Sequence, residues 1–438
     1  MNKIFFKDLE NYFDKEIELS GFVENIRNIK WVQFLVLRDS TQKIQVTIEK
    51  SDEKNAEMVE LVNNLTVEST IKVTGTLKKN ENVRLRGMEF IPTKIEVTSK
   101  SDAELPINIH DKDAQLLDQR LDYRWLDLRN EYNFNIFKIQ SDMVKYMREF
   151  MCSHDFTEIH TPKLIGAASE SGADVFEVKY FDRKAYLAQS PQFYKQMAIA
   201  SGYDRVFEVA PVFRAENSNT SRHTTEFTGF DVEFAYIDSY RDVMDFEEEL
   251  LTYTLEKLNE KYGELVKNLY GKEIVVPKEK FPRVKLADLY DELEKRYDYK
   301  VDESEKNDLT TEAERLSYRY AMDEFNSEFI FVTDYPKEKR AFYHMRKDGI
   351  PEGYDLIYRG VEITTGAERE HRYDVLVKQA KEKGLDKDVE FYLEFFKYGC
   401  PPHGGFGLGV DRLTMLVLGL PSVKESMLIF RGPNRLNP

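Results

Sequence analysis

Five stretches of the first hundred residues alternate between apolar and polar side chains, at 16–26, 31–39, 43–50, 69–79 and 88–99. They are rich in β-branched or aromatic residues, and this period-two pattern is typical of β-strands with one buried face. A helix is expected near 52–64, because Met58, Leu61 and Val62 are helically spaced. Three strands, a helix and two strands follow the order of an OB-fold β-barrel, which we predict for residues 1–100.

The remaining sequence divides near residue 130. Residues 101–130 are polar and contain proline, so we expect a hinge or linker there. Residues 131–438 mix long amphipathic helices with strands and contain the motifs that carry chemistry. The fold class is therefore α+β, with a small barrel followed by a larger domain.

The charge of the chain is strongly acidic but unevenly distributed. The net charge is −16, yet the first hundred residues carry equal numbers of acidic and basic side chains. An acidic body cannot hold nucleic acid through its overall field. Any binding of nucleic acid must therefore depend on local contacts.

The sequence shows no sign of export or membrane insertion. Its longest apolar run, 413–420, is far too short to span a bilayer, and acidic residues interrupt the N-terminal segment. The two cysteines, Cys152 and Cys400, form no CxxC pair. We therefore expect a cytoplasmic protein that does not associate with a membrane.

A polar loop with two arginines and a histidine lies in FEVAPVFRAENSNTSRHTTEFTGFDVEF, residues 207–234. Arg214, Arg222 and His223 suit a polyanion, because a guanidinium can bind two phosphate oxygens at once. Phe227 could stack on a base. Considered alone, the segment is equally compatible with a solvated hairpin whose ion pairs contribute little.

Two further stretches suit a nucleotide and a metal. In GGFGLGVDRL, residues 404–413, glycines allow backbone to approach a ligand and Arg412 begins an apolar helix, although the spacing is not that of a Walker motif. In DLIYRGVEITTGAEREHRYD, residues 355–374, Asp355, Glu362 and Thr365 offer oxygen ligands for Mg²⁺. Packing glycines and a charged strand edge are the simpler alternatives.

A lysine stands among apolar neighbours in AQSPQFYKQM, residues 188–197, downstream of ESGAD at 170–174. Lys195 lies between Tyr194 and Met197, which is unusual for a charge that only meets solvent. It could bind a carboxylate, or it could extend along the surface to water.

Taken in order, these motifs resemble those of class II aminoacyl-tRNA synthetases. FRAE and RHTTEF match motif 2 (207–234), GLGVDR matches motif 3 (404–420), and Pro162 in FTEIHTPKL matches the motif 1 proline (about 150–165). QSPQFYKQ, TEFTGFDVE and EITTGAER narrow the resemblance to the aspartyl-tRNA synthetases of subclass IIb, in their archaeal and eukaryotic branch. The resemblance covers essentially the whole chain.

The resemblance implies an antiparallel-sheet catalytic domain with flanking helices at 131–438, a small insertion at about 240–330, and a homodimer that meets at motif 1. It implies activation of L-aspartate with ATP and its transfer to tRNA. ATP would be bound by Arg214, Glu216, Arg222, His223, Phe227, Glu362 and Arg412, of which Arg214 and Arg412 would serve catalysis. Mg²⁺ would be bound by Asp355, Glu362 and Thr365.

The resemblance also implies the amino-acid and anticodon sites. Lys195 and Arg369 would bind the side-chain carboxylate of aspartate. The remaining aspartate-binding residues would be Glu170, Ser190, Gln192, Asp231 and Thr365. Phe34 and Gln45 on the barrel would stack on and hydrogen-bond to anticodon bases.

Four segments depart from the family pattern. Asp411 stands where motif 3 usually has glutamate, and Ala367-Glu368 replaces Gly-Gln before Arg369. Ile429–Gly432 replaces a C-terminal Phe-Pro-Arg-Asp, and the barrel loop at 79–87 lacks the usual proline. Because the barrel loops depart, we predict relaxed tRNA choice, with aspartate placed on tRNA(Asp) and also on tRNA(Asn).

Two other functions remain open from the sequence. The first is an asparagine–tRNA ligase, against which Lys195 argues, since an uncharged amide needs no cation. The second is a paralogue that acts outside translation, such as a ligase that makes asparagine. The barrel argues against that alternative, because in this architecture it serves tRNA.

Overall fold

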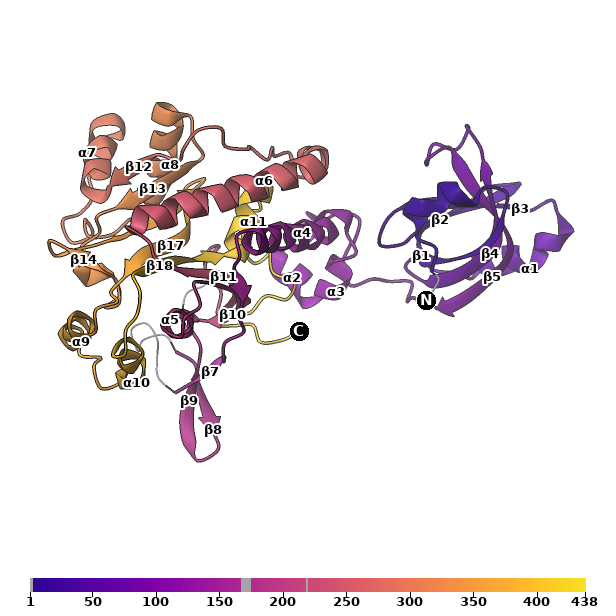
Figure 1. Cartoon of the computed structure of the whole chain (residues 1–438). Helices are drawn as coiled ribbons and strands as arrows, with labels where there is room; N and C mark the ends of the chain where they lie inside the picture. Colours follow the sequence, from indigo (N-terminus) through magenta and orange to yellow (C-terminus); the bar gives the residue numbers. More distant parts are fainter. Residues whose placement is uncertain (1–2, 167–174, 218–219) are drawn as a thin grey trace. The chain divides into compact units, whose positions relative to one another are not determined.

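Alternating apolar residues of five strands form the core of a closed barrel at the N-terminus (Figure 1). The computed structural model describes residues 3–166, 175–217 and 220–438, in two units, Met1–Pro106 and Ile107–Pro438. The barrel order is β1-β2-β3-β5-β4, which confirms the predicted OB-fold. Its elements are η1 (Phe6–Tyr12), β1 (Glu16–Asn28), β2 (Val32–Arg38), β3 (Lys43–Glu49), η2 (Glu53–Asn55), α1 (Ala56–Asn63), β4 (Thr70–Lys79) and β5 (Met88–Ser99).

The outer face of β2 and β3 carries Phe34 and Gln45. Leu35 and Val46, their neighbours in sequence, are fully buried in the barrel core, whereas Phe34 and Gln45 are half-buried. Phe34 lies opposite Thr47 in the ladder, and Gln45 donates to the hydroxyl of Thr47 over 3.2 Å. The two side chains therefore share one face, and Phe34 is not a core residue.

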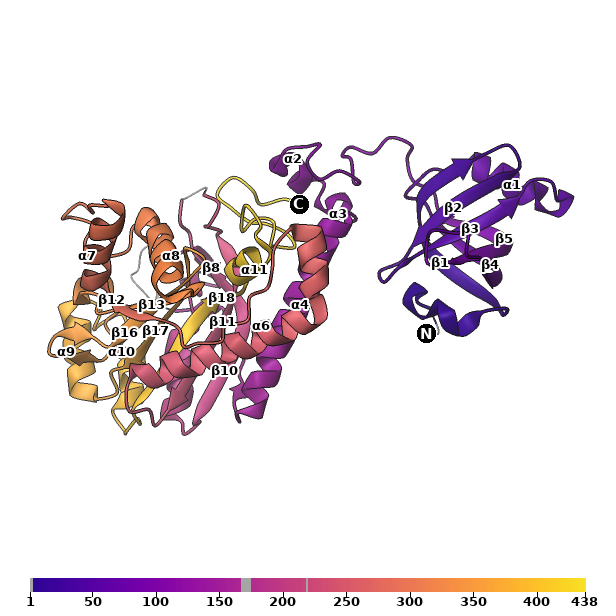
Figure 2. The same ribbon diagram turned by 90° about the horizontal axis from the view of Figure 1, so that it is seen from above.

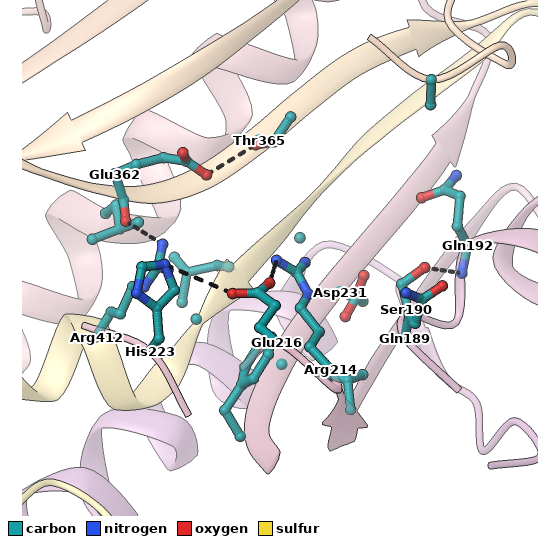
Figure 3. Close-up of a pocket in the computed structure, with 18 of the residues that line it drawn as sticks. Gln189, Ser190, Gln192, Arg214, Glu216, His223, Asp231, Glu362, Thr365 and Arg412 are labelled. Carbon is teal, nitrogen blue, oxygen red and sulfur yellow. Dashed lines mark hydrogen bonds and ion pairs between the residues drawn. The ribbon is translucent and has the colours of Figure 1, made fainter. Parts of the chain in front are cut away.

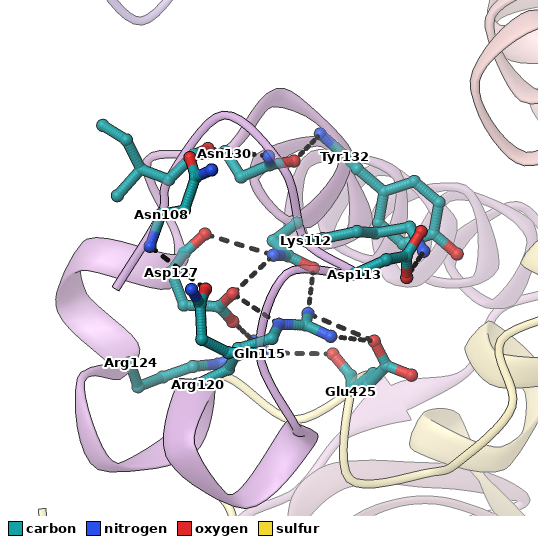
Figure 4. A network of polar contacts seen from close by, with 12 residues as sticks. Asn108, Lys112, Asp113, Gln115, Arg120, Arg124, Asp127, Asn130, Tyr132 and Glu425 are labelled. Carbon is teal, nitrogen blue, oxygen red and sulfur yellow. Dashed lines mark hydrogen bonds and ion pairs between the residues drawn. The ribbon is translucent and has the colours of Figure 1, made fainter. Parts of the chain in front are cut away.

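The segment 101–130, which was expected as a hinge, is divided between the two units at Pro106. Its second half forms α2 (Leu117–Asp122) and α3 (Arg124–Asp127) in the C-terminal unit. Buried Arg120 bonds Asp127 at 2.8 Å and Glu425 at 3.2 Å (Figure 4). Arg124 donates to the carbonyl of Met427. These charge-assisted bonds hold the segment against the end of the chain, so it differs from a free linker.

The C-terminal unit is built on an eight-stranded sheet in the order β12-β13-β16-β17-β18-β11-β10-β6. All neighbouring pairs are antiparallel except β12–β13 and β6–β10. The bounds are β6 (Thr157–Glu158), β10 (Arg205–Phe213), β11 (Glu226–Ala235), β12 (Arg283–Lys285), β13 (Phe329–Thr333), β16 (Gly353–Tyr358), β17 (Val361–Arg369) and β18 (His403–Gly409). The predicted class II architecture is confirmed.

One face of this sheet packs against α4 (Glu131–Ser153), α6 (Tyr240–Tyr270) and α11 (Val410–Leu418) (Figures 1 and 2). Phe230 and Val232 of β11 point into this core. The longest helix, α6, begins at a capping box formed by Ser239 and Asp242 and ends at Gly271, whose φ is 64°. The side chains on the opposite face of β11 do not belong to this core.

The stretch 240–330, expected as a small insertion, is largely part of the main architecture. Helix α6 belongs to the central core, and β12 extends the large sheet. Only α7 (Leu286–Tyr297) and α8 (Thr311–Phe325) form a separate cluster, which packs on β13. The reason is that α6 has twelve buried side chains along its length, and these are buried by packing against the sheet.

Shorter elements complete the unit. A small sheet, in the order β7-β9-β8, contains β7 (Leu164–Ile165), β8 (Glu177–Tyr180) and β9 (Arg183–Leu187). The others are α5 (Gln192–Ala200), η3 (Lys337–Lys339), β14 (Arg346–Lys347), β15 (Ile350–Pro351), α9 (Tyr373–Glu382), α10 (Glu390–Leu393) and η4 (Glu394–Phe396). In the described parts of the chain, we find no helix of sufficient length and apolarity to cross a membrane.

Candidate active site

A cavity of about 280 Å³ lies on the face of β11 that points away from the helical core (Figure 3). Phe227, Gly229 and Asp231 of this strand line it, alternating with the core residues of the same strand. It is also lined by twelve of the side chains singled out from the sequence: Ser190, Gln192, Arg214, Glu216, Arg222, His223, Phe227, Asp231, Glu362, Thr365, Arg369 and Arg412. Motifs that are distant in the sequence therefore meet at one place.

Of the five other expected residues, the four that the structure describes do not line the cavity. Lys195 and Asp355 are buried behind its wall. Phe34 and Gln45 belong to the N-terminal unit. Glu170 lies outside the described residues.

A buried ion network forms one end of the cavity, which we call the closed end. The Lys195 ammonium has no exposed surface and lies 2.9 Å from Asp231 and 3.5 Å from Glu233. Arg369 donates through Nε to Glu233 at 3.0 Å. Arg369 also reaches the carbonyl of Gly405 at 2.9 Å. Two buried cations thus balance two buried carboxylates before any ligand binds.

The position of Lys195 differs from the one expected for direct contact with a ligand. Its charge is needed beneath the wall, because Asp231 would otherwise be buried without a counter-ion and Glu233 would keep Arg369 alone. Burial raises the pKa of Asp231 more than Lys195 lowers it. Burial also acts on Glu233, but Arg369 and Lys195 outweigh it, so the pKa of Glu233 is lowered. Glu233 therefore stays ionised at the centre of the network.

Gln192 connects this network to the cavity surface. Its amide oxygen accepts from Arg369 over 3.3 Å, and its amide nitrogen lies 3.2 Å from Glu233. Ser190, at the start of the same turn, accepts from the backbone N–H of Gln192. The closed end is therefore rigidly bonded, with a carboxylate, an amide and a guanidinium at its surface.

The opposite end of the cavity, which we call the open end, has weak and exposed ion pairs. The guanidinium of Arg214 is 3.9 Å from Glu216, and His223 is 3.8 Å from the same carboxylate. The side chains of Arg214 and Glu216 are 44% and 30% exposed. Arg214 also lies over the ring of Phe227 at 5.3 Å. Such long, hydrated pairs are easily exchanged for a ligand anion.

Arg222 and Arg412 are fixed by neighbouring backbone and by a helix from outside the motifs. Arg222 pairs with Glu314 of α8 at 2.9 Å. The same carboxylate accepts from the backbone N–H of Glu362, and Arg412 donates to the carbonyl of Glu362 at 3.0 Å. Three charged side chains are thereby held around one segment of β17.

The oxygen ligands expected for Mg²⁺ are arranged unequally. Glu362 accepts from the hydroxyl of Thr365 at 3.1 Å, and both line the cavity. Burial, followed by the charge of Asp355, raises the pKa of Glu362 to about 7. Asp355 itself is bound by both terminal nitrogens of Arg340, at 2.9 and 2.7 Å. Among residues 3–166, 175–217 and 220–438 we find no group of three or more His, Cys, Asp or Glu side chains placed to hold a metal alone.

The substituted motif 3 residue, Asp411, is committed to the framework. It accepts from the backbone N–H of Thr228 at 2.8 Å and from the side chain of Gln140 at 3.1 Å. Burial raises the pKa of Asp411 to about 6. This carboxylate therefore ties β11 to α4 and α11 beside the open end.

Four residues of the site were not singled out from the sequence. Glu233 and Arg340 neutralise Arg369 and Asp355, while Glu314 holds Arg222. His344 lines the cavity and is 3% exposed. Glu233 could have been found by its alternation with Asp231 on a strand, but Glu314, Arg340 and His344 come from segments far from the motifs.

The chain matches two family models. Residues 117–430 match the family described as tRNA synthetases class II (D, K and N), and residues 17–98 match the OB-fold nucleic acid binding domain. The first match spans more than half of the chain and contains every motif of the cavity.

Two curated relatives and one solved structure are similar over nearly the full length. The aspartate–tRNA(Asp/Asn) ligase of Methanopyrus kandleri is 43% identical over 97% of this chain and 96% of its own. The aspartate–tRNA(Asp) ligase of Pyrococcus horikoshii is 42% identical, with the same coverage of each chain. Asparaginyl-tRNA synthetase from Pyrococcus horikoshii, solved with asparaginyl-adenylate, is 32% identical with a TM-score of 0.90, and each chain is covered completely.

Proposed function

The chain belongs to the class II aminoacyl-tRNA synthetases and is an aspartate–tRNA ligase, and from this we propose how its cavity divides the work. Aspartate binds at the closed end, and ATP binds at the open end. One observation carries this division. The closed end already has its buried charges balanced, whereas at the open end Arg214 forms only a loose, exposed pair with Glu216. A polyanion fits the second arrangement and a small zwitterion the first.

At the open end, Arg214 binds the α-phosphate. The ring of Phe227, which Arg214 overlies, stacks on adenine, and Glu216 accepts from the adenine amino group. Arg222, His223 and Arg412 hold the β- and γ-phosphates. Glu216 releases Arg214 when the phosphate arrives, because a pair at 3.9 Å is weak.

At the closed end, Asp231, Gln192 and Ser190 receive the ammonium of aspartate. Arg369 binds the side-chain carboxylate, and Lys195 contributes its charge from directly behind Asp231. Thr365 and Glu170 complete the set on the grounds of resemblance. The guanidinium of Arg369 at the cavity wall disfavours asparagine, whose amide gains nothing from a cation.

Glu362 and Thr365 would hold the Mg²⁺ that accompanies ATP. The donor set fits, because a carboxylate and a hydroxyl are hard oxygen ligands that lie on the cavity wall. Asp355 is a weaker candidate, since Arg340 already binds both of its oxygens. When bound, the metal neutralises charge on the phosphates.

The reaction proceeds in two steps. An α-carboxylate oxygen of aspartate attacks the α-phosphorus, the bond to the bridging oxygen breaks, and pyrophosphate leaves with its electron pair. Arg214 stabilises the added charge on the α-phosphate, while the two ends of the cavity hold the reactants in line. The 3′-hydroxyl of tRNA then attacks the adenylate carbonyl, and AMP leaves.

The barrel binds the anticodon through the outer face of β2 and β3. Phe34 stacks on a base and Gln45 reads a base edge, as their shared outer face allows. The substrates are tRNA(Asp) and, because the barrel loops depart from the family pattern, also tRNA(Asn). Charging assays with both purified transcripts test this choice, and a preference above about a thousandfold for tRNA(Asp) would exclude it. Phe34→Ala should weaken both by about 1–3 kcal/mol.

The chain forms a homodimer through motif 1. Pro162 is exposed, and a hollow beside α4 is lined by the exposed side chains of Trp125, Phe134 and Leu428. Such an apolar surface is typical of a protein interface, and a two-fold pair is the commonest assembly. Light scattering should give twice 51.5 kDa, and Trp125→Glu should weaken the dimer. We place the enzyme in the cytoplasm, where its substrates are.

Pyrophosphate exchange into ATP tests the activity directly. The full chain should support exchange with aspartate far better than with asparagine, because only aspartate satisfies the cations of the closed end. Exchange that depends equally on both amino acids, or only on asparagine, would contradict the assignment.

A further inference from the structure

A buried histidine with one unbonded ring nitrogen lines the cavity near its closed end. His344 lines the cavity, is 3% exposed, and its Nδ1 has no partner among the described residues. It lies beside Arg369, with which its backbone forms an isolated antiparallel bridge. Buried polar groups are nearly always bonded, so an exception at a ligand cavity requires a reason.

The packing around His344 leaves one ring nitrogen for a ligand. Nδ1 lies against Gly353, where even an added methyl group would approach it to 3.1 Å. Because an enclosed N–H without an acceptor is costlier than a spare lone pair, the proton belongs on Nε2. The ring therefore offers a single N–H donor to the cavity.

The surroundings keep this ring neutral. Burial, followed by the charges of Arg369, Arg340, Arg346 and Lys383, lowers the pKa of His344 well below its usual value. An imidazolium here would add a cation to an already cationic neighbourhood. A neutral imidazole instead offers a directional hydrogen bond without adding charge.

Resting on the function proposed above, we propose that His344 donates from Nε2 to the side-chain carboxylate of aspartate and helps to select it over asparagine. A carboxylate can accept at both oxygens, one from Arg369 and one from His344. Asparagine would have to turn its amide N–H₂ toward one of these donors. The ring cannot adapt by moving its proton, because Nδ1–H would then be buried beside Gly353 without an acceptor.

Two substitutions separate the donor from the bulk of the ring. His344→Ala removes the donor and should raise the KM for aspartate roughly 10- to 100-fold, with the KM for ATP within about twofold. His344→Gln keeps a donor but can also present an amide oxygen. It should restore part of the aspartate KM and raise the ratio of asparagine to aspartate kcat/KM by about tenfold.

The matched control is His371→Ala, since His371 also has an unbonded Nδ1 but does not line the cavity. It should leave both KM values unchanged. The proposal is overturned if His344→Ala changes the aspartate KM by less than twofold, or if it changes the aspartate and ATP KM values alike. Should that variant not fold, an unchanged amino-acid ratio in His344→Gln overturns it. Failure of the wild-type chain to exchange with aspartate would instead refute the proposed function.

Discussion

The two ends of the cavity are prepared for their ligands in different ways. At the closed end, Lys195 and Arg369 have side chains that are 0% and 4% exposed, and their carboxylate partners are already in place. At the open end, Arg214 is 44% exposed and its carboxylate partner is 3.9 Å away. The charges of the closed end therefore lose their water when the protein folds, whereas Arg214 at the open end loses its water only when the ligand binds.

This difference indicates a division between specificity and rate. Aspartate and asparagine differ by one charge in a group of similar size, so cations and donors that are fixed beforehand are needed to separate them. ATP brings several negative charges of its own, and the loosely paired Arg214 is available to the phosphate that reacts. Substitutions at the closed end should therefore act on amino-acid binding, and substitutions at the open end on turnover.

The largest effect should come from Lys195→Leu. The change leaves Asp231 and Glu233 with one buried cation fewer, a loss of roughly 3–5 kcal/mol. We expect kcat/KM for aspartate in pyrophosphate exchange to fall by at least about a hundredfold. Lys184→Leu is the control, because Lys184 pairs with Glu177 on an exposed hairpin away from the cavity. Near-normal aspartate affinity in Lys195→Leu would show that the closed end does not bind aspartate.

Arg214→Ala should act on the other quantity. Its charge is needed most when the α-phosphate carries additional charge, so kcat for exchange should fall roughly 100- to 1000-fold. The KM for aspartate should stay within a few-fold of the wild-type value, since Arg214 does not touch the closed network. A variant in which the aspartate KM rises as steeply as kcat falls would erase the distinction between the two ends.

The sequence predicts the open end better than the closed end, for a physical reason. Arg214, Arg222, His223 and Phe227 occupy one short stretch, and their residue types suit a polyanion with a base. The barrel order and the α+β architecture are likewise local patterns of periodicity, and both are confirmed. Such patterns can be recognised in the sequence because they depend on residues that are close together in the chain.

The parts that could not be predicted depend on contacts between distant segments. Lys195, on helix α5, was expected at the ligand, but its ion pairs with Asp231 and Glu233 of β11 hold it beneath the wall. Asp355 was expected to bind metal, but Arg340 reaches it across a turn. The hinge at 101–130 is fixed in its second half because Arg120 meets Glu425 from the other end of the chain. None of these pairings can be recognised from the spacing of residues in the sequence.

A third prediction concerns the stability of the helix and sheet core on which the cavity is built. Glu247 of α6 is fully buried, accepts from the hydroxyl of Tyr354 at 2.7 Å, and burial raises its pKa to about 7. In the unfolded chain the same carboxyl ionises near 4.5. The unfolded state therefore loses its proton first as pH rises, and the folded protein loses stability between about pH 4.5 and 7.

Glu247→Gln removes this loss while keeping an acceptor for Tyr354. At pH 8 the variant should gain roughly 1–3 kcal/mol in the free energy of unfolding, seen as a higher Tm. At pH 5, where Glu247 is largely protonated, the two proteins should melt almost together. An equal shift at both pH values would mean that ionisation of Glu247 does not contribute. Exchange kinetics should change little at either end, since the residue does not line the cavity.

The smallest predicted effect is a pH dependence confined to the open end. Glu362 has its pKa raised to about 7 by burial and then by Asp355, so the carboxylate that would hold Mg²⁺ is partly protonated at neutral pH. Protonation removes the metal ligand as pH falls through 7, and a bound cation opposes it. The KM for ATP with Mg²⁺ should therefore rise about tenfold between pH 7.5 and 6.

Glu362→Gln distinguishes this titration from that of ATP itself, which is common to both proteins. The variant should have a higher KM for ATP at pH 7.5 but a flatter pH dependence, because its amide does not ionise. The KM for aspartate should follow pH much less in the wild-type chain, since Glu233 stays ionised and His344 stays neutral over this range. If the two KM values changed together with pH, the titrating groups of the two ends would be electrostatically coupled. The closed and open ends would then have to be treated as one electrostatic unit.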